Sequence, residues 1–179
     1  MKTTQILIAG FGGQGILFSG KFLAYKGLME DIQVSWLPSY GPEMRGGTAN
    51  CNVILSDAPV GSPIVTTPDV LIAMNLPSLE KYVNTVAKGG QIYIDSSLID
   101  AKVMRDDVDV FYIPATQMAK DAGISSLANM IIIGHMLENN ENMSFDGVDA
   151  VVEKLVPPKK AALKELNMKA LTLGKNYKK

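Results

Sequence analysis

The chain has 179 residues, 47% hydrophobic and 20% charged, which suits one globular domain and leaves too little chain for two ordinary ones. Its formal net charge of -1 excludes a bulk electrostatic attraction to nucleic acid or to an anionic membrane. The one cysteine, Cys51, excludes an intrachain disulfide, and it excludes an iron–sulfur cluster or zinc ribbon built from thiolates of this chain alone. The first apolar run, QILIA, breaks at Gly10 and is too short for a signal-peptide core with its cleavage site or for a membrane span. We therefore expect a cytoplasmic protein with neither a nucleic-acid nor a membrane partner.

Short apolar or alternating runs predict strands at Gln5–Ala9, Gln33–Leu37, Ala49–Leu55, Asp69–Met74, Gln91–Ile94 and Val108–Ile113. Helical spacing of apolar residues follows the first strand, recurs from Leu76 to Val86 and fills most of the chain after the last strand. This alternation predicts an α/β fold: a single Rossmann-like, three-layer domain with a mostly parallel sheet and C-terminal helices. The stretch Ala49–Asp57 has no helix before it, so we expect an antiparallel excursion there. The lysine-rich helix after Pro157-Pro158 is interpreted as an appendage that packs on a neighbour.

A glycine loop follows the first strand directly and opens the first helix. Its sequence, GFGGQG, fits the pattern G-x-G-x-x-G and supplies Gly10, Gly12, Gly13, Gln14 and Gly15. In this position glycines permit a tight turn, and the helix N-terminus offers free amides to an anion. Glycines also allow close strand–helix packing without any ligand. The loop is therefore a candidate anion-binding site and, by itself, a weak signal.

The acidic residue that a dinucleotide enzyme needs for the ribose is missing from its expected place. It should follow the second strand, where the sequence reads WLPS. Glu30 and Asp31 come before that strand, at its other end. The fold is predicted to be Rossmann-like, whereas binding of NAD or NADP is disfavoured.

Other reactive side chains do not complete a catalytic or metal-binding set. His135 lies in an apolar helix without a second ligand at the next turn, and Cys51 lies on a strand without a nearby histidine, so both are predicted to be core residues. Asp95-Ser96-Ser97 ends a strand and could meet a ligand or cap the following turn. We predict no catalytic residue and no metal site in this chain. A nucleotide-type fold without its own catalytic set suggests one part of a larger complex.

Several segments together resemble a known family. In their order and residues, these segments resemble the gamma subunit of the 2-oxoacid:ferredoxin oxidoreductases. They are GFGGQGI, then SYGPEMRGGTANCNVILSD followed by GSPIV, then NLPSLEKY, and then IPATQMAKDAG with NMIIIG downstream. That family includes the pyruvate, 2-oxoglutarate, branched-chain ketoacid and indolepyruvate enzymes. The likeness runs from about Ile6 to Gly134. It implies one gamma-type domain over residues 1–179, with a C-terminal helical tail over about 145–179.

The resemblance implies the following division of labour. The assembled enzyme converts a 2-oxoacid, here 2-oxoglutarate or a branched-chain ketoacid, to an acyl-CoA and passes the electrons to ferredoxin. Thiamine diphosphate and magnesium are held by alpha and beta subunits, and iron–sulfur clusters by beta and a ferredoxin-like delta subunit. The gamma chain binds none of these firmly. It acts in assembly, is not competent alone, meets ferredoxin only indirectly, and is a candidate contributor to the coenzyme A site through the glycine loop.

The loop SYGPEMRGG is the most specific of these segments. Pro42 fixes its backbone angle and the flanking glycines permit sharp reversals. Arg45 offers a planar fork for a carboxylate or phosphate, and Glu43 could orient it or pair with another chain. A solvated loop in which the two charges satisfy each other is the alternative. We favour a subunit interface bordering the active site, formed by Ser39, Tyr40, Gly41, Pro42, Glu43, Met44, Arg45, Gly46 and Gly47.

Two further hypotheses stay open beside the non-catalytic subunit. One is a free-standing Rossmann dinucleotide-binding oxidoreductase, motivated by Gly10, Gly12 and Gly15. The other is a coenzyme A-binding module, which needs the diphosphate at the glycine loop or near Arg45. The sequence does not choose the 2-oxoacid.

Overall fold

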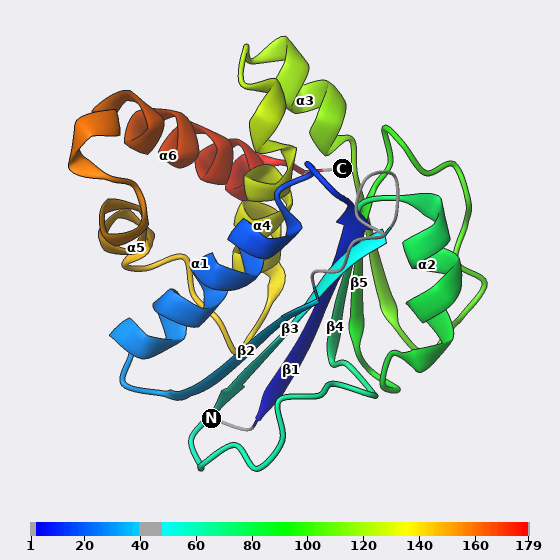
Figure 1. Cartoon of the computed structure of the whole chain (residues 1–179). Coiled ribbons are helices and arrows are strands. Elements are labelled where there is room, and N and C mark those ends of the chain that lie inside the picture. The colour runs from blue at the N-terminus through cyan, green and yellow to red at the C-terminus, as the bar shows by residue number, and fades with distance from the viewer. Residues whose placement is uncertain (1–2, 40–47, 179) are drawn as a thin grey trace.

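One mixed sheet runs through the protein, with most helices on one face (Figure 1). The computed structural model describes residues 3–39 and 48–178. The strands of the described part are β1 (Thr4–Phe11), β2 (Gln33–Ser39), β3 (Thr48–Ser56), β4 (Val70–Ala73), β5 (Gln91–Asp95) and β6 (Asp109–Ile113). Its α-helices are α1 (Ile16–Met29), α2 (Leu76–Tyr82), α3 (Ala115–Asp121), α4 (Ala128–Asn139), α5 (Val148–Leu155) and α6 (Ala161–Asn176). Short 3-10 turns lie at η2 (Val83–Thr85), η3 (Ser125–Leu127) and η4 (Pro158–Lys160).

The strand order is β2-β3-β1-β4-β5-β6. β1, β4, β5 and β6 pair in parallel, whereas β3 runs antiparallel to both β1 and β2. The predicted α/β fold and its antiparallel excursion are therefore confirmed. The excursion is a β2–β3 hairpin, which the sequence showed as two strands without a helix between them.

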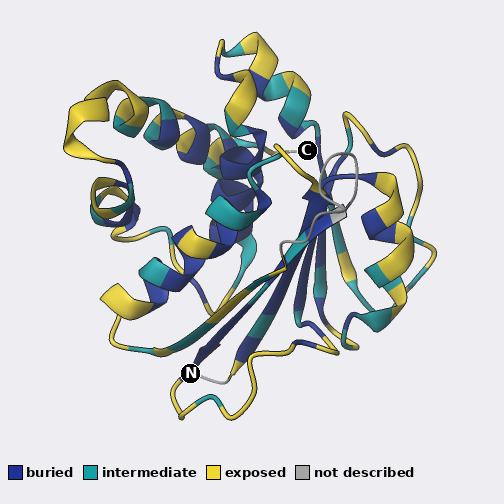
Figure 2. Cartoon of the chain, viewed as in Figure 1, coloured by how far each residue is buried: buried dark blue, intermediate teal, exposed yellow. Residues whose placement is uncertain are grey.

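The core follows from the hydrophobic patterns. β4 reads VLIA and is buried at every position, because helices cover both of its faces. On β3, Cys51, Val53 and Leu55 alternate inward and pack with α1 in the larger core cluster. A smaller cluster lies on the other face, under α2. Figure 2 shows the contrast between the buried β1 and the half-exposed edge strand β2.

The C-terminal helix belongs to this core, contrary to the expectation of an appendage that packs on a neighbour. α6 crosses α4 in close contact, and Ala170 and Leu171 of α6 are fully buried. Glycines make the crossing close: a Cβ added at Gly134 would lie 2.9 Å from Leu171 Cα, and one at Gly174 would lie 2.7 Å from the carbonyl carbon of Ile131. The two glycines let the helix backbones touch.

Candidate functional site

The glycine loop lies at the point of the sheet where ligands of open α/β folds usually bind. After β1 the chain passes through α1 to β2 on one side, and after β4 it passes through α2 to β5 on the other. The carboxyl ends of β1 and β4 therefore border a crevice at a topological switch point. Gly10, Gly12, Gly13, Gln14 and Gly15 form its rim. Gly13 and Gly15 have φ values of 94° and 76°, which only glycine adopts readily.

The side chain of Gln14 closes this loop across the crevice. Its Oε1 accepts a hydrogen bond from the backbone N–H of Phe11 at 2.6 Å, and its Nε2 donates to the backbone carbonyl of Met74 at 2.9 Å. One amide that could face an anion is thus already occupied. A diphosphate would have to displace Gln14 or use the first amides of α1, which carries no acidic residue in its first turn.

Asn129 supports the loop from the other side. Its Nδ2 donates to the carbonyl of Gly15 at 3.2 Å and to Ser19 Oγ at 3.0 Å. A Cβ on Gly15 would lie 2.7 Å from Asn129 Cγ. The segment NMIIIG contains Asn129 but does not indicate its role, because the partners of Asn129 lie more than a hundred residues away along the chain.

An apolar cavity of about 280 Å³ opens beside the loop. Glycines of the loop, the start of α1 and Ala49 line it, together with Phe11 and Phe18. Phe11 is 40% exposed. The uncharged lining suits an apolar group lying beside the start of α1, not a diphosphate alone.

The tip of β2 carries no acidic residue. β2 ends at Ser39, which pairs with Asn50 of β3. Glu30 and Asp31 precede β2 and therefore lie at the opposite end of that strand. Glu30 pairs there with the buried Lys26. A ribose-binding carboxylate is therefore absent from the described part of this crevice.

The rest of the loop SYGPEMRGG, residues 40–47, lies outside the described residues. Its two ends are placed by register: Ser39 closes β2, and Thr48 begins β3 opposite Phe11. Both of these described positions therefore lie at the same end of the strands as the glycine loop. Its assignment to an interface stays a prediction.

The carboxylate of Asp95 caps the turn that follows β5. Asp95 is fully buried, and it accepts hydrogen bonds from Thr116 Oγ at 2.5 Å and from the Ser97 amide at 3.1 Å. Of the two interpretations that the sequence left open, the geometry supports capping.

Cys51 and His135 are core residues, as predicted. Burial raises the pKa of the Cys51 thiol to about 12, so the reactive thiolate is scarce at neutral pH. His135 lies at the α4–α6 crossing, with Nδ1 3.1 Å from the carbonyl of Gly174 and its ring edge-on to Phe111 and Tyr177. Burial lowers its pKa. The described residues hold no group of three or more His, Cys, Asp or Glu side chains that could bind a metal.

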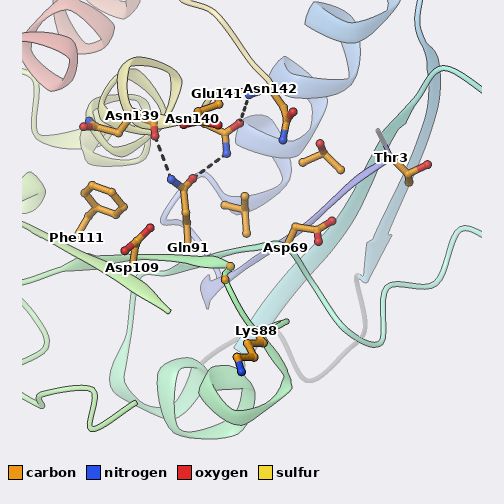
Figure 3. Close-up of a pocket in the computed structure, with 14 residues that line it drawn as sticks. Thr3, Asp69, Lys88, Gln91, Asp109, Phe111, Asn139, Asn140, Glu141 and Asn142 are labelled. Carbon is orange, nitrogen blue, oxygen red and sulfur yellow. Dashed lines mark hydrogen bonds between the residues drawn. The ribbon is translucent and has the colours of Figure 1, made fainter. Parts of the chain in front are cut away.

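A polar pocket of about 480 Å³, called the polar basin below, lies at the other end of the strands, where the parallel strands begin (Figure 3). Gln91 is at its centre: Nε2 donates to the carbonyl of Asn139 at 3.0 Å, and Oε1 accepts from Asn140 Nδ2 at 2.7 Å. Tyr93 Oη lies 3.0 Å from the same Oε1. Because these groups satisfy one another, the basin is a weaker candidate for ligand binding than the switch-point crevice.

The comparisons with known proteins identify the family. The model of the family described as pyruvate ferredoxin/flavodoxin oxidoreductase matches residues 5–177. The chain belongs to this family. The match includes the C-terminal helices, which the resemblance from Ile6 to Gly134 had left unplaced.

Family members of two different lengths resemble the chain. The 2-oxoglutarate synthase subunit KorC of Methanothermobacter thermautotrophicus is 33% identical, over 96% of this chain and 93% of KorC. The ketoisovalerate oxidoreductase subunit VorA of Methanothermobacter marburgensis is 41% identical over 76% of this chain. The chain spans only 28% of the length of VorA.

Solved structures agree on the fold of this family member. The gamma subunit of a keto/oxoacid ferredoxin oxidoreductase from Geobacter sulfurreducens superposes with a TM-score of 0.81 at 29% identity, and the match covers 96% of this chain and 95% of that one. A chain of the 2-oxoglutarate:ferredoxin oxidoreductase of Magnetococcus marinus, solved with 2-oxoglutarate, coenzyme A and succinyl-CoA bound, gives 0.86 at 25% identity. This match covers 98% of the present chain but 31% of the other. Among the described residues, no helix combines the length and apolarity needed to cross a membrane.

Proposed function

We propose that this chain is the gamma subunit of a multi-subunit 2-oxoacid:ferredoxin oxidoreductase, folded as one gamma-type domain over residues 1–179. The complex oxidatively decarboxylates a 2-oxoacid to an acyl-CoA and passes the electrons to ferredoxin. The observation that carries the proposal is the match of this family member, over nearly its whole length, to a gamma subunit of the same size. The comparisons support this function and do not support a free-standing dinucleotide-binding enzyme.

The substrate of the complex is proposed to be 2-oxoglutarate or a branched-chain ketoacid. KorC, which matches end to end, belongs to a 2-oxoglutarate synthase, whereas VorA, which shares more identity over a shorter stretch, belongs to a ketoisovalerate oxidoreductase. Both names favour these two classes over pyruvate.

The redox and thiamine chemistry is assigned to partner subunits. A cluster needs several thiolates, and this chain has one cysteine, whose buried thiol has a raised pKa. The described residues also hold no group of three or more His, Cys, Asp or Glu side chains that could bind a metal ion. We infer that thiamine diphosphate, magnesium and the clusters lie in alpha, beta and delta subunits, and that the chain itself supports assembly in the cytoplasm.

A contribution to the coenzyme A site is the second part of the proposal. The crevice rim would offer the α1 amides to a phosphate and the apolar cavity beside Phe11 to an uncharged portion of the ligand. Gln14 would have to release the Phe11 amide if the diphosphate used it. Arg45 is the candidate for a charged contact.

Two experiments test these proposals. The chain is co-expressed with the subunits encoded beside it, and 2-oxoacid- and CoA-dependent ferredoxin reduction is measured with and without this chain. We expect a complex that loses activity when the chain is omitted; full activity without it would refute the subunit role. In the complete complex, Arg45→Ala should raise the CoA concentration needed for half-maximal rate without loosening assembly. An unchanged CoA dependence would count against the CoA contact.

A further inference from the structure

The two faces of the sheet are covered unequally. α1 packs on β2 and β3 from one side, and α4 to α6 extend this layer (Figure 1). On the other side the described helix is α2, which packs on β1 and β4. The β2–β3 hairpin therefore has its helical cover on the α1 side.

Register identifies the residues on the other face. Leu7 of β1 belongs to the core under α2 and pairs with Asn52 of β3, which pairs with Leu37 of β2. Paired residues of neighbouring strands point to the same side, and alternate residues of one strand share a face. The hairpin face therefore includes Ser35, Leu37, Ser39, Asn50 and Asn52, with Phe11 beside them, whereas Ile54 on the same face is buried.

This face has the composition of an interface. Leu37 is 36% exposed and Phe11 is 40% exposed, while Ser35, Asn50 and Asn52 are half-buried. Neither β2 nor β3 contains a charged residue. Depletion of charge with retained apolar and amide groups is typical of the buried centre of a protein interface.

The composition of the edge strand supports the same conclusion. β2 forms one edge of the sheet, with Trp36 37% exposed beside Leu37. Edge strands of proteins that work alone are commonly protected by lysines or other charges, because an open edge pairs readily with other chains. β2 carries no charge, but Pro38 removes the backbone donor at its own position and so limits pairing along the edge. The uncharged face, rather than the open edge, is therefore the surface suited to a permanent cover.

The longer relatives indicate what the cover is. This chain spans 28% of VorA and 31% of the Magnetococcus marinus chain. In those proteins a long polypeptide is joined covalently to the equivalent unit and is available to pack against it.

We propose that the hairpin face docks the larger subunit of the complex, the polypeptide that corresponds to the additional length of these relatives. The partner surface presents apolar side chains to Leu37 and Phe11 and hydrogen-bonding groups to Asn50 and Asn52. This inference rests on the proposed function and adds the face through which the subunit assembles.

The test compares two leucines of matched exposure in the full complex. Leu37→Glu places a charge at the centre of the hairpin face, whereas Leu163→Glu places it on α6, where Leu163 is 39% exposed. An unpaired charge buried in an interface weakens binding, here by about tenfold or more. Each variant is co-expressed with the tagged larger subunit, and dissociation constants are measured on the purified components. Circular dichroism and melting of the free chains check that both variants fold.

Hydrogen–deuterium exchange gives a second measurement on the unchanged chain. We expect peptides covering 33–39 and 49–54 to become protected in the complex, and Leu37→Glu, but not Leu163→Glu, to lose affinity. Wild-type affinity of Leu37→Glu together with unchanged exchange over the hairpin would overturn the docking face while the subunit role stands. Failure of the wild-type chain to bind any larger subunit would instead refute the proposed function. If the exchange protection of the hairpin instead rises with the concentration of the free chain alone, a second copy of this chain covers the hairpin face. That result would overturn the larger subunit as the partner.

Discussion

Replacing Gly174 by alanine tests the close crossing of α4 and α6. The new Cβ would lie 2.7 Å from the carbonyl carbon of Ile131, 2.8 Å from the amide nitrogen of His135, and closer still to the Ile131 oxygen. Real Cβ contacts essentially never fall below 3.0 Å. Because the opposing atoms are backbone, a side chain cannot turn away and the helices must separate.

The sign of the effect distinguishes packing from helix propensity. Alanine in place of glycine favours an isolated helix by about 0.8–1.0 kcal/mol. Overpacking of this kind costs about 1–3 kcal/mol, and a backbone clash lies towards the upper end. We therefore expect a net loss of about 2 kcal/mol, which for a chain of this size lowers the melting temperature by about 4–8 °C.

Thermal and urea unfolding of the free chain, followed by circular dichroism, measures this change. Gly134→Ala should shift stability in the same direction, because its Cβ meets the backbone of Leu171. Gly61→Ala is the control, since a Cβ there meets nothing within 4 Å. If Gly174→Ala melts at or above the wild-type temperature, the close crossing is not formed as described.

Three further predictions concern His135, Cys51 and Gln14. Burial lowers the pKa of His135, so below the ordinary histidine pKa of about 6.5 the unfolded chain takes up a proton that the folded chain refuses. The contribution of a neutral His135 to stability is therefore fully present above this pH and is lost as the pH falls below it. The urea midpoint should accordingly fall less in His135→Phe than in the wild-type chain as the pH is lowered. An equal fall in both would contradict a buried His135 with a lowered pKa. Cys51, with a pKa raised to about 12, should resist alkylation in the native chain at neutral pH and react once the chain is denatured, so prompt native alkylation would exclude a buried thiol. Gln14→Met removes the bonds to Phe11 and Met74 at similar side-chain volume. It should cost about 0.5–1.5 kcal/mol in urea unfolding, because two hydrogen bonds to the backbone are lost at a site that water can partly reach, and an unchanged midpoint would contradict a stabilising role for Gln14.

Much of the fold could be predicted because its signals are local. The continuous apolar run around β4 indicated a strand covered on both faces, and the alternation in β3 identified Cys51, Val53 and Leu55 as one inward row. The two strands without an intervening helix indicated the antiparallel excursion. The tail was misread as an appendage because a lysine-rich helix gives no sign of its partner. Only the meeting of Gly134 and Gly174 reveals it.

The candidate site was predictable only in part, for a related reason. The glycine loop is contiguous, so its pattern and its position after a strand were visible in the sequence. Its closure by Gln14 and its support by Asn129 join residues 60 and 114 positions apart, respectively, and no local pattern encodes such pairs.

The amino-acid sequence by itself determined the fold class, the absence of a cysteine set for a cluster and the family resemblance, because composition, periodicity and contiguous motifs are properties of the chain alone. Tertiary structure alone decided that Gln14 occupies an amide of the loop, that α6 completes the core and that no helix of the described residues covers the hairpin face. Each of these depends on which distant backbone or side-chain groups come within contact distance, and that is settled only when the sheet assembles and its two faces are filled.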